Sequence, residues 1–290
     1  MISQIFQTKL CFALFADDTS ILYKHRNIHV ATSVINDELT IISNWFRVNK
    51  LSLNISKTNY MIFHPYQRKV DNVEIYIDKT KVSFSDKIKF LGVYLDSNLS
   101  WVNHINNICT KVSKTIGVLY RINSYVPSHI MKVLYDSLIY SQISYCNIVW
   151  GNTYPTYLNR IYLLQKKAIR LITNSNYCAS TNRLFFHLKT LNIFDVYRYQ
   201  VSIFMYKYVN ESLPIVFDNY FNLNRDYHHY PTRKSDNFHV SRFCTQAFNR
   251  SLYVMGPKFW NNLNNDIKNS KSLGIFCRNL KKHILQRYNS

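Results

Sequence analysis

The sequence predicts an α+β fold in which a mixed portion is followed by an almost wholly helical one. Up to about residue 97, short apolar runs alternate with polar turns around one amphipathic helix, which is typical of small antiparallel strands packed against a helix. Beyond a boundary near residues 97–100, apolar side chains recur every three or four positions, which is typical of helices packed on one another. The 290 residues are 47% hydrophobic and 16% aromatic, so the chain has enough apolar material for a core.

The mixed portion begins with a predicted hairpin. The apolar run Leu10–Ala16 ends at Asp17-Asp18, and a second short run, Ile21–Tyr23, follows it. Ile35, Leu39, Ile42 and Phe46 then mark one face of a helix from about His29 to Asn49. Short strands are expected at Tyr60–Phe63, Val73–Ile77, Lys81–Phe84 and Lys87–Leu95. We expect the last three of these to pair with the hairpin.

The helical portion starts at Trp101. A first helix is marked by apolar residues at helical spacing, namely Ile105, Ile108, Val112, Ile116 and Leu119. An irregular stretch rich in Tyr, His and Asn is expected to run through Ser241. Further helices are expected at Ser128–Tyr140, Tyr157–Thr173, Asp195–Asn210 and Phe276–Tyr288.

The net charge favours a polyanionic partner. There are 36 Lys and Arg against 16 Asp and Glu, a formal charge of +20. Neutralising phosphates releases their counterions, so such a charge on a folded chain favours nucleic acid. The alternative is mutational, because Asn, Lys, Ile, Tyr and Phe are the residues that an AT-biased genome over-uses.

Cysteine spacing and apolar run length indicate the compartment. The six cysteines lie at least 32 residues apart, which excludes zinc-ligand spacing, and the chain is too long for a disulfide scaffold. We therefore expect no disulfides and a nuclear or cytoplasmic protein. The longest apolar run, Leu10–Ala16, is too short to span a bilayer and is ended by two aspartates, so neither secretion nor a membrane partner is expected.

The adjacent carboxylates of Asp17 and Asp18 are the sharpest chemical feature. Two carboxylates at the end of an apolar hairpin repel each other and favour a neutralising cation. Mg²⁺ takes oxygen ligands and commonly shares its shell with substrate phosphates. The alternative is an ordinary solvated turn, in which Asp is a frequent residue.

Several segments, in order along the chain, resemble the reverse transcriptases of non-LTR (LINE-type, jockey-like) retrotransposons. Phe15-Ala16-Asp17-Asp18-Thr19 is similar to the FADDT form of that family's palm metal motif. Four further segments of this chain resemble later sequence blocks of the family, namely those at residues 49–58, 90–96, 164–170 and 257–263. The resemblance implies RNA-directed DNA polymerase activity, a nucleotidyl transfer from dNTPs that uses an RNA template and a DNA primer.

The resemblance also implies a domain organisation. Residues 1–97 would form part of a polymerase palm, made of the Asp-Asp hairpin, a helix and short antiparallel strands. Residues 98–175 would form a mostly helical thumb, and residues 176–290 a basic C-terminal extension.

In the palm, the resemblance makes Asp17 a ligand of two catalytic Mg²⁺ ions and Asp18 its partner. Lys57 would approach the phosphates of the incoming nucleotide; alternatively it is a solvated lysine in a loop. Leu91 and Gly92 would grip the primer strand, Gly92 allowing close backbone approach; a plain strand glycine is the other interpretation.

In the thumb, the resemblance implies that Lys166, Lys167 and Arg170 face template or primer phosphates. The alternative is that these three charges form only the solvated face of a helix.

The two-metal site is incomplete in this sequence. Palm polymerases need a further Asp from an upstream strand, and none of the 16 residues before Asp17 is acidic. We therefore expect a truncated fragment that is inactive by itself. The alternatives are a non-catalytic basic nucleic-acid-binding module and a degenerate retroelement remnant without activity.

Overall fold

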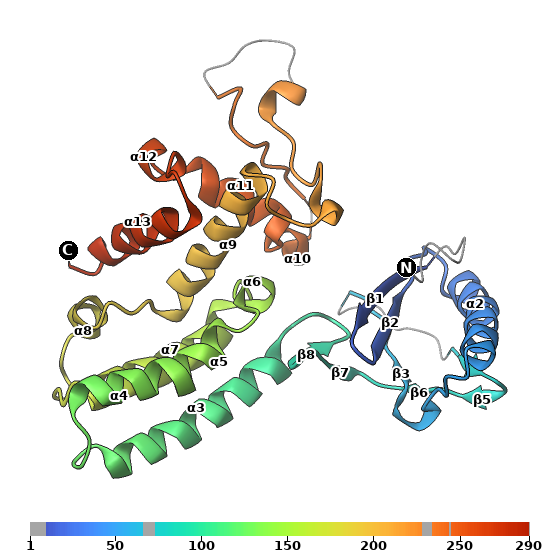
Figure 1. Ribbon diagram of the computed structural model, residues 1–290, viewed down its shortest axis with the longest axis horizontal. Helices are drawn as coiled ribbons and strands as arrows, with labels where there is room; N and C mark the ends of the chain where they lie inside the picture. The colour runs from blue at the N-terminus through green and yellow to red at the C-terminus, as the bar shows by residue number, and fades with distance from the viewer. Residues whose placement is uncertain (1–9, 66–72, 228–233, 244, 290) are drawn as a thin grey trace. The chain divides into compact units, whose positions relative to one another are not determined.

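A computed structural model describes residues 10–65, 73–227, 234–243 and 245–289 (Figure 1). The chain divides into two compact units, Met1–Leu99 and Ser100–Ser290. The first unit contains one long helix and several small sheets, and the described part of the second consists of helices and irregular segments. The expected combination of helices with small sheets, an α+β chain, is confirmed.

The described strands of the first unit form four separate two-stranded sheets. Three pairs are antiparallel, namely β1 with β2, β4 with β5 and β7 with β8, whereas β3 and β6 are parallel. The elements are β1 (Cys11–Phe15), β2 (Asp18–Leu22), α2 (Ile28–Val48), η1 (Ile55–Lys57), β3 (Asn59–Tyr60), β4 (Tyr76–Ile77), β5 (Thr80–Lys81), β6 (Ser83–Phe84), β7 (Lys87–Phe90) and β8 (Val93–Asp96).

Three expectations for these strands are wrong. The later strands do not pair with the Asp17-Asp18 hairpin, because in the described part each strand pairs within its own small sheet. Strands joined by a short turn close at low entropic cost, and strands of two to five residues offer few further bonds to a distant partner. Lys87–Leu95 is two strands, since Leu91 and Gly92 have φ of 44° and 84° and reverse the chain between them. The parallel β3–β6 pair also departs from the expected antiparallel arrangement.

Helix α2 provides the apolar face on which this unit packs. Its first turn is capped by Asn27, whose side-chain oxygen accepts from the backbone N–H of His29 at 2.9 Å. Ile35 and Leu39 pack against a buried cluster made of Ile75, Ile77 and Val82. The spacing that predicts the helix therefore also identifies the face it buries.

The second unit is built from helices of unequal length. Its elements are α3 (Val102–Ile122), α4 (Ser128–Tyr135), η2 (Asp136–Tyr140), α5 (Ser141–Ser144), α6 (Asn147–Trp150), α7 (Pro155–Ile172), α8 (Thr181–His187), α9 (Ile193–Val209), η3 (Ile215–Phe217), η4 (Asn224–Asp226), α10 (Gln246–Asn249), α11 (Leu252–Asn261), α12 (Asn265–Lys268) and α13 (Leu273–Gln286).

Helices α3 and α7 lie parallel. Arg160 Nη1 near the start of α7 donates to Asn106 Oδ1 near the start of α3, at 2.6 Å. After the last turns of the same helices, Asn123 Nδ2 donates to Asn174 Oδ1, also at 2.6 Å. The apolar residues that predict α3 are all buried, as expected: Ile105, Ile108, Val112, Ile116 and Leu119.

The expected helix Ser128–Tyr140 contains a wider turn. Element η2 is a π-helix between α4 and α5. Met131, Tyr135, Ile139 and Ile143 are all fully buried at a strict spacing of four. At about 100° per residue an α-helix would rotate each of these positions by about 40° relative to the one before. The wider π-turn offsets that drift and keeps all four side chains on the buried face.

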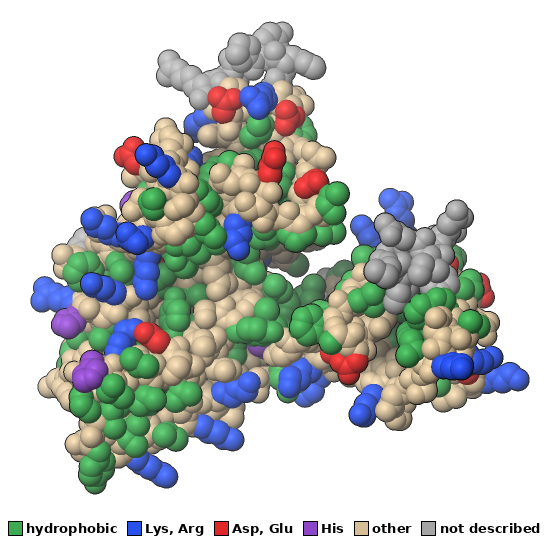
Figure 2. Space-filling model, in the orientation of Figure 1, with side chains coloured by type: hydrophobic (Ala, Val, Ile, Leu, Met, Phe, Trp, Pro, Cys, Tyr) green, Lys and Arg blue, Asp and Glu red, His purple; other side chains and the backbone are tan. Residues whose placement is uncertain are grey.

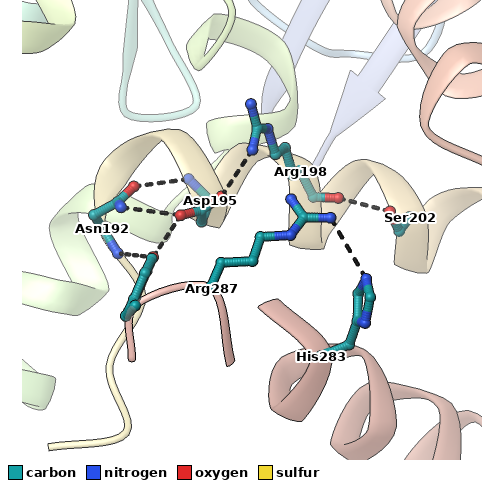
Figure 3. Close-up of polar contacts among 7 residues, drawn as sticks. Asn192, Asp195, Arg198, Ser202, His283 and Arg287 are labelled. Atoms are coloured by element: carbon teal, nitrogen blue, oxygen red, sulfur yellow. Dashed lines mark hydrogen bonds and ion pairs between the residues drawn. The ribbon is translucent and has the colours of Figure 1, made fainter. Parts of the chain in front are cut away.

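A buried carboxylate fixes the end of the chain to the start of α9 (Figure 3). Tyr288 Oη donates to Asp195 Oδ2 at 2.5 Å, and Asn192 Nδ2 donates to the same oxygen at 2.9 Å. Arg198 Nη1 lies 3.3 Å from the other oxygen. Burial and the neighbouring Asp195 carboxylate raise the pKa of Tyr288 well above its usual value. A buried Asp with this number of donors is satisfied, so we assign it a structural role.

In the described part of the stretch expected to be irregular, aromatic side chains pack against one another. Tyr208, Phe221 and Phe238 contact one another edge-on, with ring centroids 4.9–5.9 Å apart. The Tyr208 hydroxyl also donates to the Phe221 carbonyl at 3.0 Å. Aromatic packing therefore takes the place of regular secondary structure here.

Candidate functional site

The Asp17-Asp18 hairpin has the geometry that the sequence predicts. Strands β1 and β2 pair in register, Phe15 lies opposite Asp18, and Ala16 and Asp17 form a two-residue turn. Ala16 has a φ of 51°, a value that two-residue hairpin turns usually assign to glycine. A strained backbone at such a position is one mark of a functional turn. Both aspartates are exposed, so their carboxylates can reach a ligand in solution.

The two carboxylates have the oxygen ligands that a hard cation prefers, but two side chains are too few to form a complete metal site. Oxygen ligands suit Mg²⁺, which is usually held by carboxylates together with water and substrate phosphates. Across residues 10–65, 73–227, 234–243 and 245–289, no three His, Cys, Asp or Glu side chains are grouped to hold a metal. Asp17 and Asp18 could give oxygen ligands to such a cation, but no third ligand is grouped with them among the described residues.

The other site residues expected in the first unit lie on separate elements. Lys57 is exposed at the end of η1, where its backbone N–H donates to Asn54. In the part of the chain that the structure describes, no ion pair joins its ammonium to Asp17 or Asp18. Leu91 and Gly92 form the two-residue turn between β7 and β8, with Leu91 half-buried and Gly92 exposed.

The three cations expected on α7 have different surroundings. Lys167 is exposed. The Lys166 ammonium lies 4.8 Å from the ring centroid of Tyr162. Arg170 donates through Nε and Nη2 to the Ala179 carbonyl at 3.3 and 3.2 Å, and its guanidinium lies 5.4 Å from the Tyr177 ring centroid. Lys167 is therefore the most available of the three, and Arg170 also has a structural role.

The positive charge is concentrated in the second unit. Residues 100–290 contain 24 Lys and Arg against 7 Asp and Glu, whereas residues 1–99 contain 12 against 9. Between residues 102 and 209, twelve basic residues face only two carboxylates. Asp136 is paired with Lys132, and Asp195 is buried in the contacts described above. Figure 2 shows Lys and Arg side chains over these helices, with few acidic side chains among them.

A polar groove between α3 and α7 is not evident from the sequence. It is lined by Asn106, Cys109, Thr110, Ser113, Lys114 and Arg160. The α3 residues recur at helical spacing on a face that flanks the buried one, which is a signal present in the sequence. Which helix covers that face depends on tertiary packing, so Arg160 could not be assigned to it in advance.

Comparison with known proteins identifies relatives from insect mobile elements. A probable RNA-directed DNA polymerase from transposon X-element of Drosophila melanogaster is 28% identical over 190 residues, 64% of this chain and 21% of the relative. The RNA-directed DNA polymerase from mobile element jockey is 27% identical over 194 residues in Drosophila funebris, 66% of this chain and 21% of the relative. The chain is similar to reverse transcriptases of non-LTR retrotransposons.

The similarity to these reverse transcriptases confirms the resemblance seen in the sequence. The jockey reverse transcriptase of Drosophila melanogaster is 26% identical over 199 residues, 67% of this chain. The chain spans about a fifth of the length of the curated relatives it matches. No family model matches the chain, and no solved structure matches it.

Two further findings on this reverse-transcriptase-like chain concern membrane-spanning helices and disulfides. None of the described helices combines the length and the apolar character needed to cross a bilayer. The cysteines that the structure describes carry free thiols, namely Cys11, Cys109, Cys146, Cys178 and Cys277.

Proposed function

We propose that this chain is a segment of a non-LTR retrotransposon reverse transcriptase and takes part in templated transfer of a deoxynucleotide to a primer 3′-hydroxyl. The similarity to curated RNA-directed DNA polymerases over about two thirds of the chain carries this proposal. Residues 1–97, which include the FADDT motif at Phe15–Thr19, would be part of the palm, residues 98–175 the thumb and residues 176–290 a C-terminal extension.

In this proposal the first unit supplies part of the catalytic centre. Asp17 and Asp18 would give carboxylate oxygens to Mg²⁺, with the remaining ligands coming from outside the described residues. Lys57 would contact nucleotide phosphates, and the Leu91-Gly92 turn would contact the primer. The positive φ of Gly92 supports this last role, since a residue without a Cβ lets a backbone approach closely.

The second unit would bind the RNA template and DNA primer. The excess of 24 basic over 7 acidic residues supports phosphate binding without sequence preference. Lys166, Lys167 and Arg170 on α7 would contribute to it, with Lys167 the most exposed.

RNA-templated primer extension tests the proposal. The chain is joined to the upstream fingers and palm segment of a jockey polymerase and supplied with Mg²⁺, dNTPs and a primed RNA. We expect extension that Asp17→Asn abolishes and that Asp37→Asn, an exposed carboxylate change on α2, leaves intact. The 290-residue chain alone should show no extension. Extension that survives Asp17→Asn would contradict the proposed role of the hairpin.

A further inference from the structure

The α3 side of the groove between α3 and α7 is part of a longer exposed stripe on α3. Asn106, Thr110, Ser113, Gly117 and Tyr120 follow one another at spacings of four, three, four and three, so they form one stripe of the helix. The first three line the groove. A Cβ built on Gly117 would meet no atom within 4 Å, so this stripe is open. The stripe is about 21 Å long at 1.5 Å per residue.

The neighbouring edge of α7 is cationic. Arg160 lines the groove beside Asn106, and Lys167 and Arg170 follow it by seven and ten residues, two and three turns along the same helix. Because α3 and α7 are parallel, the cations of one helix run alongside the hydroxyl and amide groups of the other. Such a groove suits a chain of phosphates.

Exposed aromatic rings lie at or just after the carboxyl-terminal ends of α3 and α7. Tyr120, Tyr125 and Tyr177 are 74%, 85% and 83% exposed, among the most exposed large side chains of the chain. Tyr125 follows α3 and Tyr177 follows α7, and the Asn123–Asn174 hydrogen bond brings these two segments together. The Arg170 guanidinium against the Tyr177 ring joins the cationic edge to the aromatic end.

We propose that the α3–α7 groove binds single-stranded nucleic acid, with phosphates along the α7 cations and unpaired bases stacked on Tyr125 and Tyr177. Exposed aromatic rings beside a positive groove are the elements by which proteins hold unpaired strands, since every base has a face that stacks. Paired bases in a duplex do not offer those faces. The twelve basic residues against two carboxylates in this region favour a polyanion over a neutral protein partner. The inference rests on the proposed function in taking nucleic acid as the ligand.

Fluorescence anisotropy separates stacking from charge. The full chain is titrated with labelled oligo(dT) and with an abasic strand that has the same number of phosphates. The pair Tyr125→Ala and Tyr177→Ala should raise the Kd for oligo(dT) by about thirtyfold or more and leave the Kd for the abasic strand unchanged. The pair Tyr125→Phe and Tyr177→Phe keeps both rings and should retain affinity. Tyr145→Ala, at an exposed tyrosine after α5, is the matched control.

A second measurement distinguishes failure of this inference from failure of the proposed function. Arg160→Ala with Lys167→Ala should reduce the salt dependence of binding to both strands, by about 0.7 in the slope of log K against log salt for each lost phosphate contact. Equal weakening of both strands by the Ala pair, or loss of affinity in the Phe pair, would overturn the stacking inference alone. Tighter binding to anionic phospholipid vesicles than to either strand would overturn it as well. Binding to no strand would contradict both proposals.

Discussion

His104 is a buried histidine in the first turn of α3, with its ring edge-on to the indole of Trp150 at 5.1 Å between centroids. Burial, with a smaller effect of the Lys111 charge, lowers the pKa of His104 to about 4. Between this value and the ordinary 6.5, the unfolded chain binds more protons than the folded chain, so stability falls as pH falls through that range. We expect the folded chain to lose about 2 kcal/mol from this residue between pH 7 and pH 5.

Urea denaturation at the two pH values measures this loss. His104→Gln should remove most of the difference, because no titrating group is left at that position. His129→Gln changes an exposed histidine of α4 and should keep the pH dependence of the original chain. An unchanged pH dependence in His104→Gln would mean that other groups determine it.

Gly92 is a residue, like His104, at which a single substitution has a predictable effect on stability. Its φ of 84° lies in the region that L side chains rarely adopt. Gly92→Ala should destabilise the β7–β8 hairpin by about 1 kcal/mol. Hydrogen exchange of the hairpin amides measures this, with faster exchange expected in the variant. Gly274→Ala is the control, since a Cβ there meets nothing and the position is helical.

At the scale of elements, the β1–β2 hairpin has strand edges without a partner in the described part of the chain. Leu14 and Phe15 on β1 are 48% and 62% exposed. Unpaired edges with apolar side chains favour association with other strands. We expect the chain to self-associate, and Leu14→Lys to reduce the apparent mass by light scattering at micromolar concentration. Val48→Lys on α2 is the control, and an equal reduction there would indicate association through apolar surface in general.

The sequence predicts elements better than their pairing. The positions of α2, α3, α7 and α9 follow from apolar spacing, because burial of one face determines both the pattern and the helix. The chain reversal at Leu91-Gly92 is not evident from the sequence, because leucine rarely adopts a positive φ. The π-turn η2 and the separate sheets depend on packing between distant segments, which local periodicity does not report.

For the candidate site, the hairpin turn at Asp17 and the cations of α7 could be located from sequence. The role of Arg170 at the Ala179 carbonyl and the α3–α7 groove could not, since both need the fold of the loop and of the neighbouring helix. Their chemical roles remain predictions.

At the scale of the whole molecule, the two units differ in their balance of charge. The 24 to 7 excess of basic residues in the second unit produces self-repulsion, whereas the first unit is nearly balanced at 12 to 9. We expect the thermal unfolding temperature of the second unit to rise between low and physiological salt, as screening reduces the repulsion. Calorimetry measures this, and a temperature that falls with salt would indicate that ion pairs dominate instead.

The parallel arrangement of α3 and α7 has an electrical consequence. Each helix carries a partial positive charge at its amino end and a partial negative charge at its carboxyl end. In an antiparallel pair these would cancel, but here both positive ends lie near the Asn106–Arg160 contact and both negative ends near the Asn123–Asn174 contact. The backbone dipoles therefore add to a graded field along the groove. A bound strand would meet its strongest attraction for phosphate at one end and its aromatic surface at the other.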